Sequence, residues 1–396
     1  MRLLKIISNG ISDCFVIWKQ ELWNIGKDIG VILMFIIVPL FYPILYGLIY
    51  NTETIHETPL IVVDESHSSS AREFVRKIDA SPDVSVFAYA SSLEEARERM
   101  NRKEASGILL IPSDFSRKIN RGEQAVTALY ADMASILYYQ AILLAATEAS
   151  LEMAGEIRVQ TADDPILYES VPLYNPQKGF ASFLLPAILV LVIQQTLLLG
   201  TGILCATSRE RNRGRLLPPD KIHTGTLRIV FGKALAYLTI YIFVCIWALV
   251  IVPHLFRIPQ LTHFNMLLLF ILPLQLSCIF FAMTIAAFIR GRETPMMVLA
   301  FTSLIFLFIS GVSWPASAIP DFWRYAGYLV PSTLGIQGFV KLNSMGADLW
   351  EIAFEYRMLW LLTGIYFITT CLIYRYEIIR TFKEAYVQRD ETEPDH

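Results

Sequence analysis

Six long apolar stretches alternate along the chain with polar segments of very different lengths. A helix needs roughly 20 mostly apolar residues to cross a bilayer, and the stretches are close to or above that length. They cover residues 30–50, 180–206, 229–252, 265–289, 296–314 and 358–374. We therefore predict an α-helical polytopic membrane protein with six transmembrane helices. The first would occupy residues 29–51, and the other five would lie within 179–375.

Residues 1–28 show an amphipathic pattern instead of an apolar run. Apolar residues recur every three or four positions and form one stripe on a helix, with charged residues opposite. Such a helix could lie at the cytoplasmic membrane interface or pack on the rest of the protein. Asp13 and Glu21 interrupt the apolar region that a cleavable signal peptide would need. The apolar stripe consists of Leu4, Ile7, Ile11, Phe15, Trp18, Leu22 and Ile25.

A single long polar region, residues 52–178, separates the first apolar stretch from the second. Short runs rich in β-branched residues alternate there with amphipathic segments, an order typical of an α/β domain with a mainly parallel sheet. The runs predicted as strands are 59–66, 83–90, 106–115 and 124–132, and the predicted helices are 68–81, 92–104 and 136–160. Because the region is long enough to bury its own core, we expect an inserted extracytoplasmic α/β domain.

Lys and Arg are unevenly distributed over the loops between the apolar stretches. The segment 207–228 is rich in arginine, and the loop 290–293 adds Arg290 and Arg292. On the opposite side, the loop 253–264 has only one arginine. Because basic residues favour the cytoplasmic side, we predict that both termini, including a tail from 376 to 396, are cytoplasmic.

The composition supports a membrane protein and argues against other classes. Hydrophobic residues make up 54% of the chain and charged residues 17%, with a mean hydropathy of +0.47, whereas soluble proteins average about 25% charged. A net charge of -3 argues against a nucleic-acid partner, which would require a basic surface. The five cysteines match no zinc or redox spacing, so we interpret them as small buried side chains.

Motifs for catalysis and nucleotide binding are absent from the sequence. The pair Gly232–Lys233 is followed by alanine, so it does not complete a phosphate-binding loop. Asp64, Glu65 and His67 are close enough to suggest a metal site, but acids at the end of a strand are more common as solvated loop residues. We predict that this chain is not an enzyme and holds no cofactor or metal, so any ATP and magnesium would be bound by a partner.

The interiors of the apolar stretches contain uncharged polar residues but no convincing acid or base. Lys233, one turn inside the third stretch, is expected to extend back to the cytoplasmic surface. Uncharged side chains at this depth more often bridge helices than contact a substrate, and both interpretations stay open. The candidate substrate path consists of Gln194, Gln195, Gln275, Thr302 and Ser303.

Three stretches carry a resemblance to a known family. "SRERNRG" (208–214) is similar to an arginine- and glutamate-rich segment that precedes a Gly-Lys pair in the permease subunits of ABC-2 type exporters. "SGILLIPSDFSRKINRG" (106–122) and "SGVSWPASAIPDFWRYAGYLVPSTLGIQGF" (310–339) are similar to the family's outer-domain and re-entrant segments. The chain resembles this family over essentially its whole length, in particular the bacterial branch with a large periplasmic domain.

The resemblance implies a dimer of six-span subunits in the bacterial inner membrane, each bound to a cytoplasmic ABC ATPase subunit. It implies export of a hydrophobic or amphipathic substrate (a drug, lipid or lipid-linked molecule) by alternating access. It also places an ATPase-coupling loop at 207–228, with the following residues in it: Arg209, Glu210, Arg211, Gly214 and Arg215. Here "GRLLPP" replaces the family's usual Thr and Glu after the glycine, and we therefore hypothesise pairing with a different permease chain.

The resemblance also implies a re-entrant exit region at 315–340, marked by Trp314, Pro315, Pro320 and Pro331. Membrane anchoring by interfacial aromatic residues is the alternative interpretation of this segment. A large periplasmic domain weakly suggests a periplasmic adaptor protein, and the apolar surface implies contact with membrane lipid. A different function stays open, namely a membrane receptor or scaffold whose outer domain binds a ligand or a partner.

Overall fold

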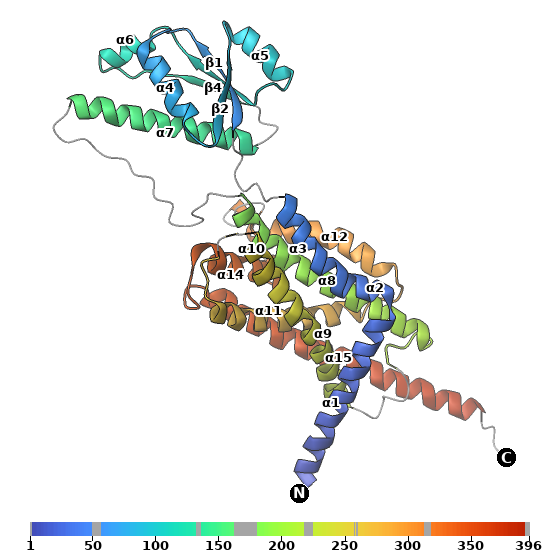
Figure 1. Ribbon diagram of the computed structural model, residues 1–396. Coiled ribbons are helices and arrows are strands. Elements are labelled where there is room, and N and C mark those ends of the chain that lie inside the picture. Colours follow the sequence, from blue (N-terminus) through green and yellow to red (C-terminus); the bar gives the residue numbers. More distant parts are fainter. Residues whose placement is uncertain are drawn as a thin grey trace. The chain divides into compact units, whose positions relative to one another are not determined.

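The computed structural model divides the chain into two compact units, each with its own hydrophobic core. The helical unit consists of Met1–Asn51 and Leu173–His396, and the α/β unit of Thr52–Pro172 (Figure 1). The residues that the structure describes are 2–49, 57–131, 136–161, 180–217, 225–256, 258, 260–312 and 318–392.

The α/β unit is built on a four-stranded sheet in the order β2-β1-β3-β4. The strands are β1 (Thr58–Asp64), β2 (Val84–Tyr89), β3 (Gly107–Ile111) and β4 (Ala128–Ala131). β1 pairs in parallel with β2 and with β3, and only the β3–β4 pair is antiparallel. The four predicted strands and the mainly parallel sheet are therefore confirmed.

Helices cover both faces of this sheet because residues of β1 point alternately to its two sides. Leu60 and Val62 face a core formed with α4, α6 and α7, whereas Ile61 and Val63 face a smaller core formed with α5. The helices are α4 (Ser69–Asp79), α5 (Leu93–Asn101), α6 (Phe115–Asn120) and α7 (Ile136–Thr161). The helices predicted at 68–81, 92–104 and 136–160 correspond to α4, α5 and α7.

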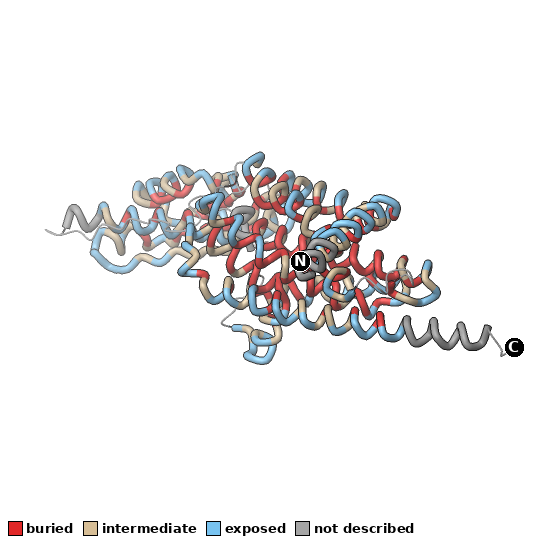
Figure 2. Tube along the Cα trace, turned by 90° about the horizontal axis from the view of Figure 1, so that it is seen from below, coloured by how far each residue is buried: buried red, intermediate tan, exposed pale blue. Residues whose placement is uncertain are grey.

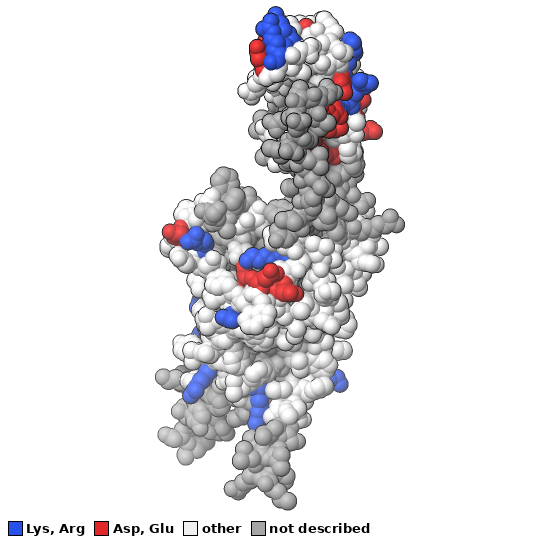
Figure 3. Space-filling view, turned by 90° about the vertical axis from the view of Figure 1, so that its left-hand side faces the viewer, with Lys and Arg blue, Asp and Glu red and all other residues white. Residues whose placement is uncertain are grey.

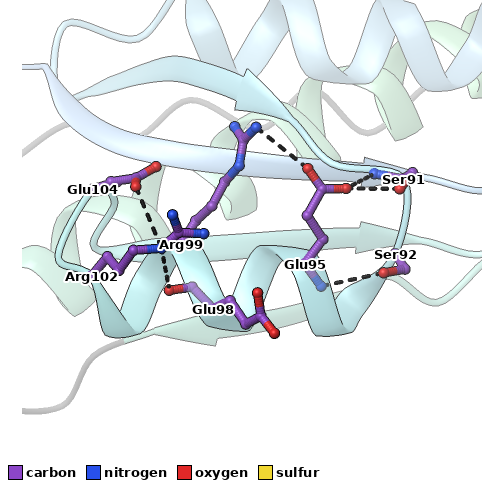
Figure 4. A network of polar contacts seen from close by, with 7 residues as sticks. All are labelled: Ser91, Ser92, Glu95, Glu98, Arg99, Arg102 and Glu104. Atoms are coloured by element: carbon purple, nitrogen blue, oxygen red, sulfur yellow. Dashed lines mark hydrogen bonds and ion pairs between the residues drawn. The ribbon is translucent and has the colours of Figure 1, made fainter.

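Serine caps fix the start of two of these helices. Ser68 Oγ accepts a hydrogen bond from Ala71 N, and Ser92 Oγ accepts one from Glu95 N. Figure 4 shows that the Glu95 carboxylate turns back to the N-terminal side of α5, where Ser91 N and Ser91 Oγ donate to it at 3.0 and 2.7 Å. These hydrogen bonds lower the pKa of Glu95. The two caps satisfy backbone N–H groups that the helix itself leaves unpaired.

The helical unit consists of long apolar helices and several shorter ones. Its first part contains α1 (Arg2–Lys27), α2 (Ile29–Ile32), the π-helix η1 (Leu33–Ile37), α3 (Val38–Ile49) and α8 (Phe180–Arg211). Its second part contains α9 (Thr226–Ile246), the π-helix η3 (Trp247–Ile251), α10 (Val252–Leu255), α11 (Phe264–Ala286), α12 (Thr294–Ile309), α13 (Asp321–Gly327), α14 (Pro331–Met345) and α15 (Ala353–Thr392).

Five helical segments among the described residues are long and apolar enough to cross a membrane. They are Ile29–Ile49, Leu184–Arg211, Thr226–Leu255, Phe264–Ala286 and Ala353–Arg380. The stretch predicted as the fifth span, 296–314, forms the shorter helix α12, Thr294–Ile309. Figure 3 shows mostly uncharged side chains on this face of the helical unit, apart from one patch of red and blue and a few single Lys or Arg side chains. A largely uncharged surface is expected where a protein contacts lipid.

Helices α8 and α11 form the centre of this unit. In the most apolar part of the α8 and α11 spans, 83% and 72% of the residues are buried, compared with 22% in the first and last spans. Buried residues concentrate in the interior of the trace, with exposed residues around them (Figure 2). Gly200 allows the first span to pack closely against α8, because a Cβ at position 200 would lie 2.1 Å from the ring of Phe35.

Helix α1 packs on α9, which was one of the two predicted arrangements. A Cβ on Gly232 of α9 would lie 2.8 Å from Ile17 and 2.9 Å from the carbonyl oxygen of Cys14, so the glycine permits this close approach. Another side of α1 leaves Phe15 and Trp23 exposed, and these residues are suited to a membrane interface. The segment 376–392, predicted as a tail, continues α15 as helix to Thr392.

Candidate functional site

The charged segment after the second apolar stretch begins inside α8, because this helix continues to Arg211. Arg209 is buried and its guanidinium points into the helical unit. It donates to Gly214 O at 3.1 Å, to Ala287 O at 2.6 Å and to Glu377 Oε1 at 3.2 Å. Arg209 therefore joins the end of α8 to the turn after it, to the end of α11 and to α15.

Glu210 takes part in a second set of contacts at the same end of the helical unit. Its carboxylate lies 3.0 Å from Arg292, in the loop between α11 and α12. Arg292 also donates to Asp28 Oδ2 at 3.2 Å and to Thr207 Oγ1 at 2.9 Å, and Thr207 donates to Asp28 at 2.8 Å. Asp28 caps α2 through Gly30 N. These contacts connect α8 with the first span and with the start of α12.

A third set of contacts joins α1 to α9. Lys233 Nζ lies 2.7 Å from Glu21 Oε1, and Tyr237 donates to the same oxygen at 2.6 Å. Both charged side chains are largely buried, so the expectation that Lys233 extends to the surface is wrong. Because α1 packs over Gly232, the Glu21 carboxylate reaches the Lys233 ammonium group. The ammonium group is thus paired inside the protein and does not have to be solvated. Arg228 and Asp13 form a further ion pair nearby.

Arg211 and Arg213 differ from Arg209 because both are exposed. In the part of the chain that the structure describes, neither side chain makes a hydrogen bond or ion pair. Arg213 has a φ of 51° and Gly214 a φ of 85°, so the chain turns sharply after α8. Arg215 is half-buried and has a partner. Arg211 and Arg213 are thus available to another molecule, whereas Arg209 and Arg215 already have partners.

A pocket of about 190 Å³ opens beside these arginines, between α1, the end of α8 and the start of α9. Its wall combines apolar and polar side chains, including Ile17, Asn24, Ser208, Arg211 and Asn212. Asn212 donates to Ser208 Oγ at 3.2 Å, and Ser208 donates to Leu216 O at 2.8 Å. These hydrogen bonds stiffen the turn that carries Arg213 and Gly214.

The three glutamines predicted for a substrate path are buried within the helical unit. Gln194 Oε1 accepts a hydrogen bond from Ser332 N at 2.6 Å, and Gln275 donates to Cys245 Sγ at 2.7 Å. Both glutamines therefore bridge helices, which is one of the two interpretations given for them from the sequence. Gln195 has no hydrogen-bond partner for either side-chain atom among the described residues. A role of these residues in substrate transport stays a prediction.

The other predicted site residues lie on or near α12, α13 and α14. Thr302 and Ser303 are half-buried on α12 and donate to carbonyl groups of their own helix. Pro320 directly precedes α13, and Pro331 is the first residue of α14 and is buried. Trp314 and Pro315 lie outside the described residues. No group of acidic, histidine and cysteine side chains suited to a metal occurs among the described residues.

Sequence reasoning missed the acidic partners of this site. Asp28, Glu377 and Glu21 lie far from Arg209 and Lys233 in the sequence, and each is at most 9% exposed. The sequence did contain a general signal. Charged residues at the ends of apolar helices are rarely buried unless they have an oppositely charged partner. The sequence does not say which basic residue each acid meets.

Similarity to a known protein family identifies the class to which this chain belongs. A model of the ABC-2 family transporter proteins matches residues 29–372, which include both the α/β unit and the spans. The chain belongs to the ABC-2 transporter family. It is therefore a membrane transport protein of the permease kind, and the ABC-2 family in general works with an ABC ATPase. No curated protein shows significant similarity to the chain.

Proposed function

We propose that this ABC-2 protein is the permease subunit of an ATP-driven exporter and that its coupling surface is the exposed part of the turn after α8. The observation that carries the proposal is the different use of neighbouring arginines. Arg209 is committed to internal contacts, whereas Arg211 and Arg213 are exposed beside a pocket. An acidic surface of a separate ATPase subunit would bind the exposed pair.

The internal contacts would transmit a displacement of this turn, caused by the ATPase subunit, to other helices. Through Arg209, a displacement of the end of α8 would act on Glu377 of α15 and on the end of α11. Through Glu210 and Arg292 it would act on Asp28 and hence on the first span. ATP binding and hydrolysis in the partner would thereby change which side of the membrane the path faces.

The topology proposed for this chain has six crossings, with α12 as the fifth. The start of α1 and the end of α15 lie at the same end of the helical unit (Figure 1), an arrangement that supports an even number of crossings. Five helices are long enough, and α12 would span about 24 Å at 1.5 Å per residue. The arginine-rich end would face the cytoplasm of a bacterium with the protein in its inner membrane.

The proposed substrate is hydrophobic or amphipathic, because the polar residues on the path are uncharged. A working exporter would contain a second permease subunit, and the unusual "GRLLPP" sequence favours a different chain in that role. ATP and magnesium would be bound by the ATPase subunit. A periplasmic adaptor protein is a further proposed partner of the α/β unit.

The test is reconstitution of the full chain in lipid nanodiscs with an ABC ATPase subunit from the same cell. We expect a stable complex and an ATP hydrolysis rate that differs from that of the ATPase alone. If the two chains neither bind nor alter hydrolysis, the exporter proposal fails and the receptor or scaffold alternative gains support. If only one permease species is found in the isolated complex, the proposal of a second, different permease is wrong.

A further inference from the structure

Helix α14 begins deep inside the helical unit. Ser332, Thr333 and Leu334, in its first turn, are at most 1% exposed, and the carboxamide of Gln194 on α8 accepts the Ser332 amide hydrogen. About 20 Å of helix separates Gln194 from Thr207, at 1.5 Å per residue. The N-terminus of α14 therefore lies within the roughly 30 Å apolar thickness of a bilayer.

Three buried polar atoms at this N-terminus lack a hydrogen-bond partner among the described residues. They are Nε2 of Gln194, Oγ of Ser332 and Oγ1 of Thr333. The N-cap residue, Val330, has no side-chain oxygen that could cap the helix. Because buried polar groups are almost always hydrogen-bonded, three unpaired atoms around one helix start require an explanation.

The free groups favour a hydrogen-bond acceptor. Gln194 Nε2 can only donate, and its Oε1 already accepts from Ser332 N and lies 3.7 Å from the Cys278 thiol. The two hydroxyl groups can also donate. The helix start adds partial positive charge. No Lys or Arg in the described residues is bonded to these groups, and a full negative charge would be costly to bury without one.

We infer that Gln194, Ser332 and Thr333 form a binding site for an uncharged hydrogen-bond acceptor, the carbonyl or ester oxygen of an amphipathic molecule. The inference rests on the proposed export of such a molecule and assigns its polar group a contact inside the membrane. In transporters of other architectures, half-helices that start at membrane depth point their N-termini at anionic substrate groups. Here no basic side chain among the described residues is bonded at the site, so the same kind of helix start suits an uncharged acceptor. Gln194 also links this site to the coupling surface, because α8 carries both.

The test compares an ester with an alkane of the same chain length on the full chain in nanodiscs. A diazirine-bearing fatty-acid methyl ester is photolysed, and labelled peptides are identified by mass spectrometry. We expect labelling near Gln194 and Ser332 that methyl palmitate suppresses about fivefold better than hexadecane, the factor that one net hydrogen bond contributes. Equal suppression by both competitors, or labelling confined to lipid-facing surfaces, would overturn the inference.

Two kinds of variant separate the site from general packing. Gln194→Leu should abolish the preference for the ester, whereas Thr201→Val should keep it, because Thr201 is also buried on α8 but its hydroxyl donates to carbonyl groups of its own helix. If Gln194→Leu does not fold, Thr333→Val and Ser332→Ala remove single hydroxyl groups and should each weaken the preference. An unchanged preference in all folded variants contradicts the inference. Photolabelling requires no ATPase, so its failure is distinguishable from failure of the export proposal.

Discussion

The guanidinium of Arg209 lies 3.2 Å from the carboxylate of Glu377, a residue on the last helix of the chain. Both side chains are nearly buried, at 9% and 11% exposure. An arginine in a segment that the sequence suggests is a surface loop therefore acts as an internal connection between α8 and α15. Its loss would remove one ion-pair partner from a buried carboxylate.

Arg209→Met should destabilise the helical unit by about 3 kcal/mol, because it removes an ion-pair partner from a buried carboxylate and the hydrogen bonds to Gly214 O and Ala287 O. Arg209→Met combined with Glu377→Leu should recover much of this loss, since a buried pair can often be replaced by apolar residues. The measurement is the apparent melting temperature of the purified chain. If the double variant is no more stable than Arg209→Met alone, the ion pair with Glu377 is not the source of the stability that Arg209 provides.

Arg211→Glu should leave the melting temperature unchanged and should disrupt coupling to the ATPase. Its side chain is exposed and has no partner among the described residues, so reversing its charge breaks no internal contact. The measurements are co-purification with the ATPase and stimulation of ATP hydrolysis. Arg121→Glu, an exposed arginine of the α/β unit, serves as the control for a general charge effect. Normal coupling in Arg211→Glu would remove this residue from the proposed interface.

The sequence predicted the secondary structure of the α/β unit because its pattern is local. The predicted strand 59–66 corresponds to Thr58–Asp64, and the predicted strand 83–90 to Val84–Tyr89. Ser68 at the start of α4 was a recognisable cap. Alternation in strands, helical periodicity and caps depend on neighbouring residues, so one sequence is sufficient to read them.

The contacts of the candidate site could not be predicted in this way. Asp28 meets Arg292, and Glu21 meets Lys233, across more than two hundred positions of the chain. Apolar stretches specify that helices form, but their nearly uniform faces do not specify which helices lie together. Packing of α1 on α9 depends on the absence of a side chain at Gly232, and a single glycine in an apolar helix has many explanations.

Gly232→Leu should separate α1 from α9 and weaken the Lys233–Glu21 ion pair. Even a Cβ at this position would lie 2.8 Å from Ile17 and 2.9 Å from a backbone oxygen, and overpacking costs about 1–3 kcal/mol. The melting temperature should fall, and the amides of α1 should exchange faster with deuterium. Gly364→Leu on α15, where nothing lies within 4 Å of a Cβ, should do neither. Equal effects of the two variants would contradict the packing role.

The start of α5 should be sensitive to acid through Glu95. Hydrogen bonds from the Ser91 side chain, then from its backbone, lower the pKa of this carboxyl below its ordinary value of 4.5. A lowered pKa in the folded state stabilises the fold fully above the unfolded value. That contribution is lost as the pH falls through the lowered pKa, so α5 should loosen at pH values below the ordinary pKa of 4.5.

The measurement is deuterium exchange of the α5 amides in the full chain, corrected for the intrinsic effect of pH. Glu95→Gln should already exchange faster at neutral pH and should show little further change on acidification. Ser92→Ala removes the cap at the other side of the same turn and should cost about 1 kcal/mol, with the pH dependence of Glu95 retained. If the wild-type chain and Glu95→Gln lose protection of α5 in parallel as the pH falls, the acid sensitivity comes from a different group.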